Sequence, residues 1–161
     1  MTGAGRFEKV SEQQYIRDTQ AYPEALNLQD IPMPARATRG SAGYDLVCPV
    51  EMEIAPGERK VMPTGLRVLL RPEWMLMLCP RSSLGRKWGL RLANTVGIVD
   101  SDYAEADNEG HILLVLEHSH SETVRIHRGE RICQGIFLPV GLTEDDEASA
   151  PRRGGYGSTG T

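Results

Sequence analysis

The chain has 161 residues and a mass of 17.8 kDa, the size of one domain that can bury a substantial core. Its 18 lysine and arginine residues are outnumbered by 22 acidic residues, which gives a net charge of −4. This balance argues against the wrapping of nucleic acid and against attraction to an anionic membrane. The longest apolar stretches, 74–79 and 112–116, are far shorter than the roughly 20 residues that span a bilayer.

One short helix is predicted near the start of the chain, because Ser11 can cap it and Gln14 can reciprocate three residues later. Three prolines between residues 21 and 39 then indicate an extended connector. We therefore expect residues 1–34 to form an N-terminal arm.

Short apolar runs separated by turns follow the arm. The 17 glycines and 10 prolines recur between these runs, several of which are rich in β-branched residues. The pattern predicts an all-β domain over residues 35–143. Its strands are expected at residues 44–48, 51–54, 60–62, 66–70, 75–79, 91–99, 112–117, 124–126 and 132–140.

The end of the chain combines an acidic run at 144–147 with a glycine-rich segment at 153–160. This composition predicts a linker and a flexible flap over residues 144–161. Arginine, glycine amides, two hydroxyls and an aromatic ring would allow the flap to close over a nucleotide. A low-complexity tail without a ligand is the alternative.

The three cysteines, Cys48, Cys79 and Cys133, lie far apart in apolar surroundings. Their odd number and their spacing favour reduced core residues over a disulfide framework or a zinc site. The first ten residues also lack the apolar region of a secretory signal. Together these features predict a cytoplasmic protein.

A phosphate-binding group is one interpretation of Arg81, Ser82 and Ser83, which directly follow an apolar strand. A charged fork beside short hydroxyl donors suits phosphate oxygens. The alternative is a solvated turn whose serines cap a short helix. The segment is not a P-loop, because the sequence contains no Gly-Lys-Ser/Thr.

Carboxylates supply the second candidate group. Asp100 and Asp102 follow an apolar run and share a face if the strand continues, and Tyr103 comes next. Such a carboxylate can deprotonate a water, and the ring can stack on a sugar or base, although an aspartate-rich turn is the alternative. Asp45 lies inside an apolar strand, so it must face a polar cleft or meet an arginine.

Four histidines lie between residues 111 and 127. His118 and His120 could share a strand face as metal ligands, but no third ligand stands at a helpful spacing. We therefore expect solvated loop histidines.

Five segments, in this order, resemble the motifs of the trimeric dUTP pyrophosphatases (dUTPases). The resemblance covers residues 32–161 and implies a distorted antiparallel jelly roll of the β-clip type. It also implies a homotrimer with three sites, each built from three chains, that hydrolyses dUTP to dUMP and pyrophosphate. The matching segments are SAGYDL at 41–46, PRSSLG at 80–85, NTVGIVDSDY at 94–103, GERICQGIF at 129–137 and RGGYGSTG at 153–160.

The resemblance also implies roles for individual residues. Asp100 would activate the water that attacks the α-phosphorus, and Asp45 would hold Mg²⁺ through a water while the ion coordinates the triphosphate. The uracil and deoxyribose would be contacted by Asn94, Gly97, Ile98, Tyr103 and Tyr156. The phosphates would be contacted by Arg81, Ser82, Ser83, Gln134, Arg153, Gly157, Ser158 and Thr159, with Arg152 as the alternative to Arg153.

Two segments depart from the family's pattern. Pro151 stands where the fifth motif usually has its arginine, and residues 104–109 intervene before Gly110, where the third motif usually reaches glycine sooner. We expect residues 104–109 to form a surface insertion near the mouth of the site.

Two alternative functions stay open. A dCTP deaminase of related fold also carries an Arg-Ser-Ser-Leu element, but its catalytic glutamate position is Val115 here, and Glu117 lies two residues further on. A non-catalytic nucleotide-binding protein on the same scaffold is the other alternative.

Overall fold

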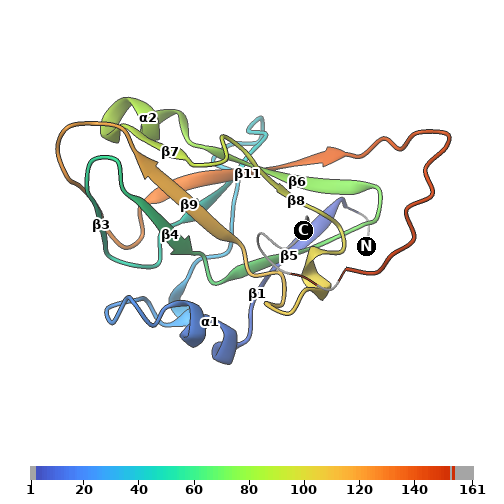
Figure 1. Ribbon diagram of the computed structural model, residues 1–161, viewed down its shortest axis with the longest axis horizontal. Helices are drawn as coiled ribbons and strands as arrows, with labels where there is room; N and C mark the ends of the chain where they lie inside the picture. Colours follow the sequence, from blue (N-terminus) through green and yellow to red (C-terminus); the bar gives the residue numbers. More distant parts are fainter. Residues whose placement is uncertain (1–2, 153, 155–161) are drawn as a thin grey trace.

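The computed structural model describes residues 3–152 and residue 154. Within this part of the chain the structure is mostly β, with two short α-helices and two 3₁₀ turns (Figure 1). No helix in it is both long and apolar enough to cross a membrane. The strands are β1 (Gly5–Lys9), β2 (Tyr44–Val47), β3 (Met52–Ile54), β4 (Arg59–Pro63), β5 (Leu66–Leu70), β6 (Trp74–Pro80), β7 (Leu90–Leu92), β8 (Gly97–Val99), β9 (Leu113–His118), β10 (Val124–Ile126) and β11 (Arg131–Pro139). The helices are α1 (Glu12–Asp18) and α2 (Ser82–Trp88), and the turns are η1 (Leu28–Asp30) and η2 (Tyr103–Glu105).

The strands pair antiparallel in four small sheets. One has the order β2-β11-β6-β8 and another the order β4-β9-β7, while β1 pairs with β5 and β3 with β10. The longest ladder joins β11 to β6, from Cys133 opposite Pro80 to Pro139 opposite Trp74. The all-β prediction is therefore confirmed, and β8 lies at the edge of its sheet.

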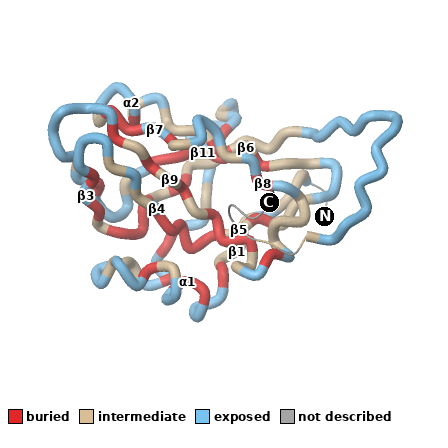
Figure 2. The backbone as a smooth tube through the Cα atoms, in the orientation of Figure 1, coloured by how far each residue is buried: buried red, intermediate tan, exposed pale blue. Residues whose placement is uncertain are grey.

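The core lies between the inward faces of these sheets, where Figure 2 shows the buried segments. Along β9 the side chains alternate, so that Leu114 and Leu116 point inward. Cys48 and Cys133 are fully buried and free, and burial raises the pKa of each thiol to about 12. The expectation of reduced core cysteines is confirmed for this pair.

The predicted strand over residues 91–99 is wrong, because the structure divides it into β7 and β8. Between them Thr95 adopts a left-handed conformation with φ of 67°, which few β-branched residues accept. Its turn is closed by the Val96 N–H, which donates to the Asn94 carbonyl at 2.7 Å. The sequence signal failed here because the turn contains no glycine or proline.

The N-terminal segment contains the predicted helix and a strand that the sequence did not predict. Ser11 caps α1, since its Oγ accepts from the Gln14 N–H at 3.1 Å. The expected reciprocal bond from Gln14 is wrong, because the Ser11 N–H donates instead to Glu109. The unpredicted strand is β1, whose alternating charged residues gave no apolar run.

The expectation of solvated histidines holds for His120 and His127, which are exposed, and is wrong for the other two. His111 and His118 are buried, with exposures of 0% and 1%. His118 ends β9 on the inward-facing side of the strand, in line with Leu114 and Leu116. His111 precedes β9, and its ring is held inside by bonds to Gly65 and Asp18.

Candidate functional site

A pocket of about 190 Å³ opens beside β8 and β9. It brings together Asn94, Gly97, Ile98, Asp100 and Tyr103, all of which the sequence predicted as site residues. The remaining lining residues are the apolar Leu78, Leu92, Val99, Ile112, Leu113, Leu114 and Val115, together with Arg152. An apolar cleft with a few polar groups is the usual form of a small-molecule site.

Asp100 follows the end of β8, so its position does not depend on strand alternation. The chain turns at this point because the Tyr103 N–H donates to the Asp100 carbonyl at 3.1 Å. The turn leaves 57% of the Asp100 side chain exposed at the pocket. Its carboxylate is thus placed where a water or a ligand can reach it.

Tyr103 stands on η2, and hydrogen bonds at its hydroxyl hold its ring in the pocket wall. Its Oη donates to the His111 carbonyl at 3.1 Å and accepts from Asn108 Nδ2 at 3.0 Å. Residues 104–109 therefore contribute to the site through Asn108, rather than lying only on the surface. The residues of the third motif do not indicate this contribution, because Asn108 lies after them in the chain.

Arg152 returns to the pocket from the segment that follows β11, which Figure 1 shows leaving the body and coming back. Its Nε donates to Asp102 Oδ1 at 2.7 Å, a second nitrogen bonds Asp100, and its guanidinium lies 5.5 Å from the centre of the Tyr103 ring. These partners, the Asp102 hydrogen bond first, raise the pKa of Arg152. Only 10% of the side chain is exposed, so it stays charged between two carboxylates.

Asp45 on β2 belongs to a second group of predicted site residues. One of its oxygens lies 3.0 Å from Arg81 Nε and the other accepts from an Arg131 nitrogen at 3.2 Å. The expectation that Asp45 meets an arginine is confirmed. Arg131 was missed by the sequence reasoning, although its place in the GERIC segment of the fourth motif was a signal that could have found it.

Gln134 lies opposite Asp45 in the β11–β2 ladder, and so belongs to this second group. It packs closely on Gly43, where an added Cβ would lie 2.2 Å from the Gln134 side-chain oxygen. Only glycine fits there without displacing the amide. The glycine of the first motif therefore makes room for the glutamine of the fourth.

Ser82 and Ser83 form the first turn of α2, directly after Arg81. The helix is held by the buried Leu84 and ends at Gly89, whose φ is 60°. The alternative interpretation as a short helix is correct in part, since the capping position is Arg81 and its side chain makes no capping hydrogen bond. Both serines follow Arg81 at the end of β6.

The two groups occupy separate places in one chain. In the described part of the chain, none of Asp45, Arg81 and Gln134 lines the pocket that holds Asp100. The other predicted site residues, Arg153, Tyr156, Gly157, Ser158 and Thr159, lie outside the described residues. A single chain thus presents two partial sites.

Metal binding by protein ligands alone finds no support among residues 3–152. They contain no group of three or more histidine, cysteine, aspartate or glutamate residues that could hold an ion. Asp45 retains lone pairs beyond its two arginine contacts, and Mg²⁺ is usually held by one or two carboxylates, waters and substrate phosphates. The residues present therefore fit an ion that arrives with a triphosphate.

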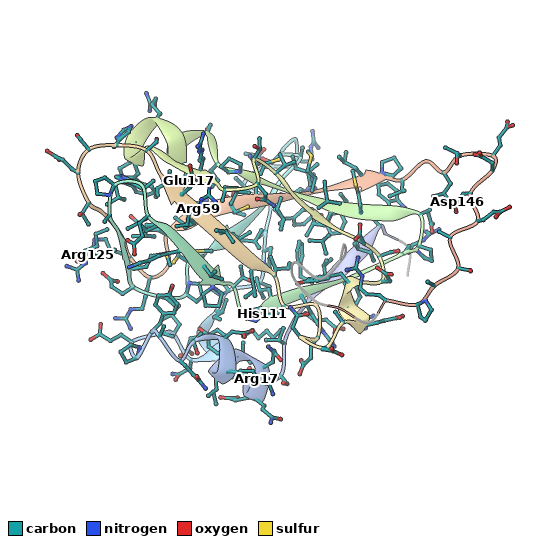
Figure 3. All side chains as sticks on the ribbon, in the orientation of Figure 1. Arg17, Arg59, His111, Glu117, Arg125 and Asp146 are labelled. Carbon is teal, nitrogen blue, oxygen red and sulfur yellow. The ribbon has the colours of Figure 1, made fainter. Side chains whose placement is uncertain are left out.

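Glu117, the acid that lies two residues beyond the deaminase glutamate position, pairs with arginines instead. It accepts from Arg91 at 2.5 Å and from Arg59 at 2.8 Å, and these bonds, Arg91 first, lower the pKa of its carboxyl. Figure 3 shows Glu117 beside Arg59 on neighbouring strands. Two residues earlier on β9, the apolar Val115 lines the pocket instead.

Comparisons with known proteins agree with these observations. The sequence model of the dUTPase family matches residues 29–160. A deoxyuridine 5'-triphosphate nucleotidohydrolase of Lactococcus lactis is 43% identical over 133 residues, covering 81% of this chain and 89% of the relative. An Escherichia coli protein of the same name is 39% identical over 140 residues, covering 82% of this chain and 89% of the relative.

Solved structures give the same result for the fold. A dUTPase from Streptococcus mutans superposes with a TM-score of 0.71 and 34% identity, covering 86% of this chain and 98% of the other. A mutant dUTPase of phage phi11 of Staphylococcus aureus, described as coordinating a structural Mg(II) ion, has the same fold at a TM-score of 0.67 and 17% identity, covering 92% of this chain and 98% of the other. The chain belongs to the dUTPase family.

Proposed function

We propose that this chain hydrolyses dUTP to dUMP and pyrophosphate, with Asp100 as the general base. The observation that most directly supports this proposal is that Asp100 lines the same pocket as Asn94, Gly97 and Tyr103. Relatives at 39–43% identity are named as deoxyuridine 5'-triphosphate nucleotidohydrolases, and the deaminase position is the apolar Val115. This composition supports hydrolysis of the triphosphate, with release of pyrophosphate, rather than deamination of the base.

Base recognition is assigned to β8. Because β8 is the edge strand of its sheet, its backbone donors and acceptors on the side away from β6 can pair with the edge of a uracil. Gly97 and Ile98 supply this backbone, and Asn94 adds an amide. A cytosine would leave buried groups unpaired, at a cost of about 1–3 kcal/mol each.

Sugar recognition is assigned to Tyr103, whose ring forms part of the pocket wall and would lie under the deoxyribose. A ring held at its hydroxyl by two hydrogen bonds cannot easily move aside. It would therefore exclude the extra hydroxyl of a ribose by steric contact.

Phosphate recognition is assigned to the second group and to the end of the chain. Arg81 would bind phosphate oxygens as a charged fork, with Ser82, Ser83 and Gln134 as neutral partners. Arg153, Tyr156, Gly157, Ser158 and Thr159 are assigned to the triphosphate and the base from the sequence alone. Asp45 would hold Mg²⁺ through water, and the bound ion would neutralise charge that develops on the phosphates.

A homotrimer would unite the two partial sites. Within the described chain, Asp45, Arg81 and Gln134 do not line the pocket. We therefore propose that a neighbouring subunit supplies its own Asp45, Arg81 and Gln134 to the phosphate-binding part of the site. Three equivalent sites would result from three chains, as expected for a closed ring of identical subunits.

The chemical step needs a water in line with the α-phosphorus and a base to take its proton. Asp100 accepts that proton, while arginine side chains balance the charge that spreads over the phosphate oxygens. Arg152 bonds Asp100 in this structure. It must release that carboxylate before the base can act, and a triphosphate is the anion that can draw the guanidinium away.

The test is Asp100→Asn with Mg²⁺ and dUTP. Turnover should fall by about 10²–10⁴-fold, while affinity for a non-hydrolysable imido analogue of dUTP stays nearly constant, because the base acts only in the chemical step. Asp107→Asn, in an exposed position of the neighbouring loop, serves as the control and should keep wild-type turnover.

Three results would contradict the proposal. Equal turnover by Asp100→Asn would remove this residue from its role. Ammonia release from dCTP by the wild-type protein would identify a deaminase. Tight binding of dUTP with no pyrophosphate release would identify a non-catalytic binding protein.

A further inference from the structure

The N-terminal arm packs against the loop that follows the candidate base. The dUTPase family model begins at residue 29, so β1 and α1 lie outside the matched segment. Figure 1 shows α1 along the lower edge of the molecule. Its two ends each contact the 104–111 segment, which includes the insertion. These contacts connect the N-terminal arm, which precedes the matched segment, to the loop that departs from the usual third motif.

The first contact is at the start of α1. The carboxylate of Glu109 accepts from the Ser11 N–H at 2.8 Å and from the Ser11 hydroxyl at 2.6 Å. These two bonds, the hydroxyl first, lower the pKa of Glu109. The carboxylate is therefore ionised at neutral pH, and it fixes the end of the insertion to the cap of the helix.

The second contact is at the end of α1. Asp18 Oδ2 lies 2.5 Å from His111 Nδ1, and Gln14 donates to the same oxygen at 2.8 Å. On the far side of the ring, His111 Nε2 accepts from the Gly65 N–H at 2.8 Å. Because Nε2 is an acceptor, the imidazole proton lies on Nδ1 and is donated to Asp18.

The ring of His111 is completely buried between α1 and the turn at Gly65 that precedes β5. Figure 3 labels His111 above Arg17 of α1. Both ring nitrogens are hydrogen-bonded, so the ring is held on two sides and restrains the backbone that carries it. Its carbonyl accepts from Tyr103 Oη. The chain of contacts therefore runs from α1, through His111, to the pocket wall.

The backbone of the 104–111 segment is also closely packed next to His111, at Gly110. Gly110 has a φ of 72°, and an added Cβ would lie 2.6 Å from the Ala104 Cα atom. The backbone at Gly110 is thus in close contact with the residue that follows Tyr103. A shift of His111 would be transmitted to Tyr103 by packing as well as by the hydrogen bond.

We propose that Asp18 is a positioning residue that sets how strongly the enzyme selects deoxyribose over ribose. It acts through His111, whose carbonyl holds the Tyr103 hydroxyl, so that the N-terminal arm determines the rigidity of the sugar-facing wall. The proposal rests on the proposed function, in which Tyr103 lies under the sugar.

The test compares kcat/KM for dUTP with kcat/KM for UTP in the full chain. Asp18→Ala removes the acceptor of the His111 proton and should lower the dUTP to UTP ratio by about five- to tenfold. Asp18→Asn keeps an acceptor oxygen and should restore most of the ratio. Arg17→Ala, an exposed neighbour on the same helix, should keep the wild-type ratio.

An Asp18→Ala ratio within about twofold of wild type would overturn the proposal, whether or not the melting temperature falls. If Asp18→Ala fails to fold, Glu109→Ala removes the contact at the other end of α1 and should lower the ratio in the same direction. An unchanged ratio in that variant would then overturn the proposal. Failure of the proposed function itself would look different, because the wild-type protein would not hydrolyse dUTP.

Discussion

His111 shows how one side chain can serve stability and the site together. It is buried, neutral and bonded at both nitrogens, and burial, opposed by Asp18 and Glu109, lowers its pKa below the usual 6.5. A proton therefore binds the unfolded chain more readily than the folded one. The contribution of His111 is fully present above pH 6.5 and is lost as the pH falls through its lowered pKa.

We expect the melting temperature to fall between pH 7 and pH 5, and expect His111→Gln to flatten this dependence. His120→Gln, also at an exposed position, is the control and should keep the wild-type slope. Carboxyls with a lowered pKa, such as Glu117, titrate below pH 4.5, so they affect stability in a separate, more acidic pH range. Thermal unfolding monitored by circular dichroism gives both slopes, and an equal slope in His111→Gln would contradict the expectation.

At the residue scale, the sequence predicted which residues line the pocket better than it predicted their side-chain partners from distant segments. Asn94, Gly97, Ile98, Asp100 and Tyr103 meet at one pocket, because they lie in one short segment around β8. The ion pair of Asp45 was anticipated from the cost of a buried charge. Partners from distant segments, such as Arg152 on Asp100, were not assigned, because side-chain pairing across the fold leaves no local pattern.

At the scale of elements, most strands lie where alternation and turn residues predicted them. β5 and β10 have the predicted bounds, and several others differ by one residue at an end. The failures have physical causes: Thr95 accepts a left-handed turn without glycine, and β1 carries charges on a strand that is stabilised by pairing with β5. Tertiary contacts override local preference at both places.

Gly110 provides the prediction at this scale. Gly110→Ala should destabilise the fold by about 2–4 kcal/mol, because an alanine there meets backbone atoms in addition to the strain of a left-handed residue. Gly129→Ala is the matched control: its φ is 85°, but an added Cβ meets nothing within 4 Å. Gly129→Ala should lower the free energy of unfolding by only about 1–2 kcal/mol. Urea unfolding measures both, and equal losses would show that the contact with Ala104 is unimportant.

At the scale of the whole molecule, the proposed site needs more than one chain and both ends of each. Deleting residues 152–161 should lower kcat/KM for dUTP strongly, while sedimentation still gives three times the chain mass of 17.8 kDa. A shorter deletion of residues 153–161 keeps Arg152 and separates its contribution from that of the segment after it. An unchanged rate in the longer deletion would show that the end of the chain does not close the site.

Tyr103 is the residue on which the described parts of both chain ends converge. The N-terminal arm supports its loop through His111, and Arg152 lies over its ring. An affinity tag or reporter protein joined to either end would therefore be attached to a segment that leads to Tyr103. Nucleotide selectivity measured on tagged and untagged protein should differ, and tag-free material is the proper reference for any inhibitor screen.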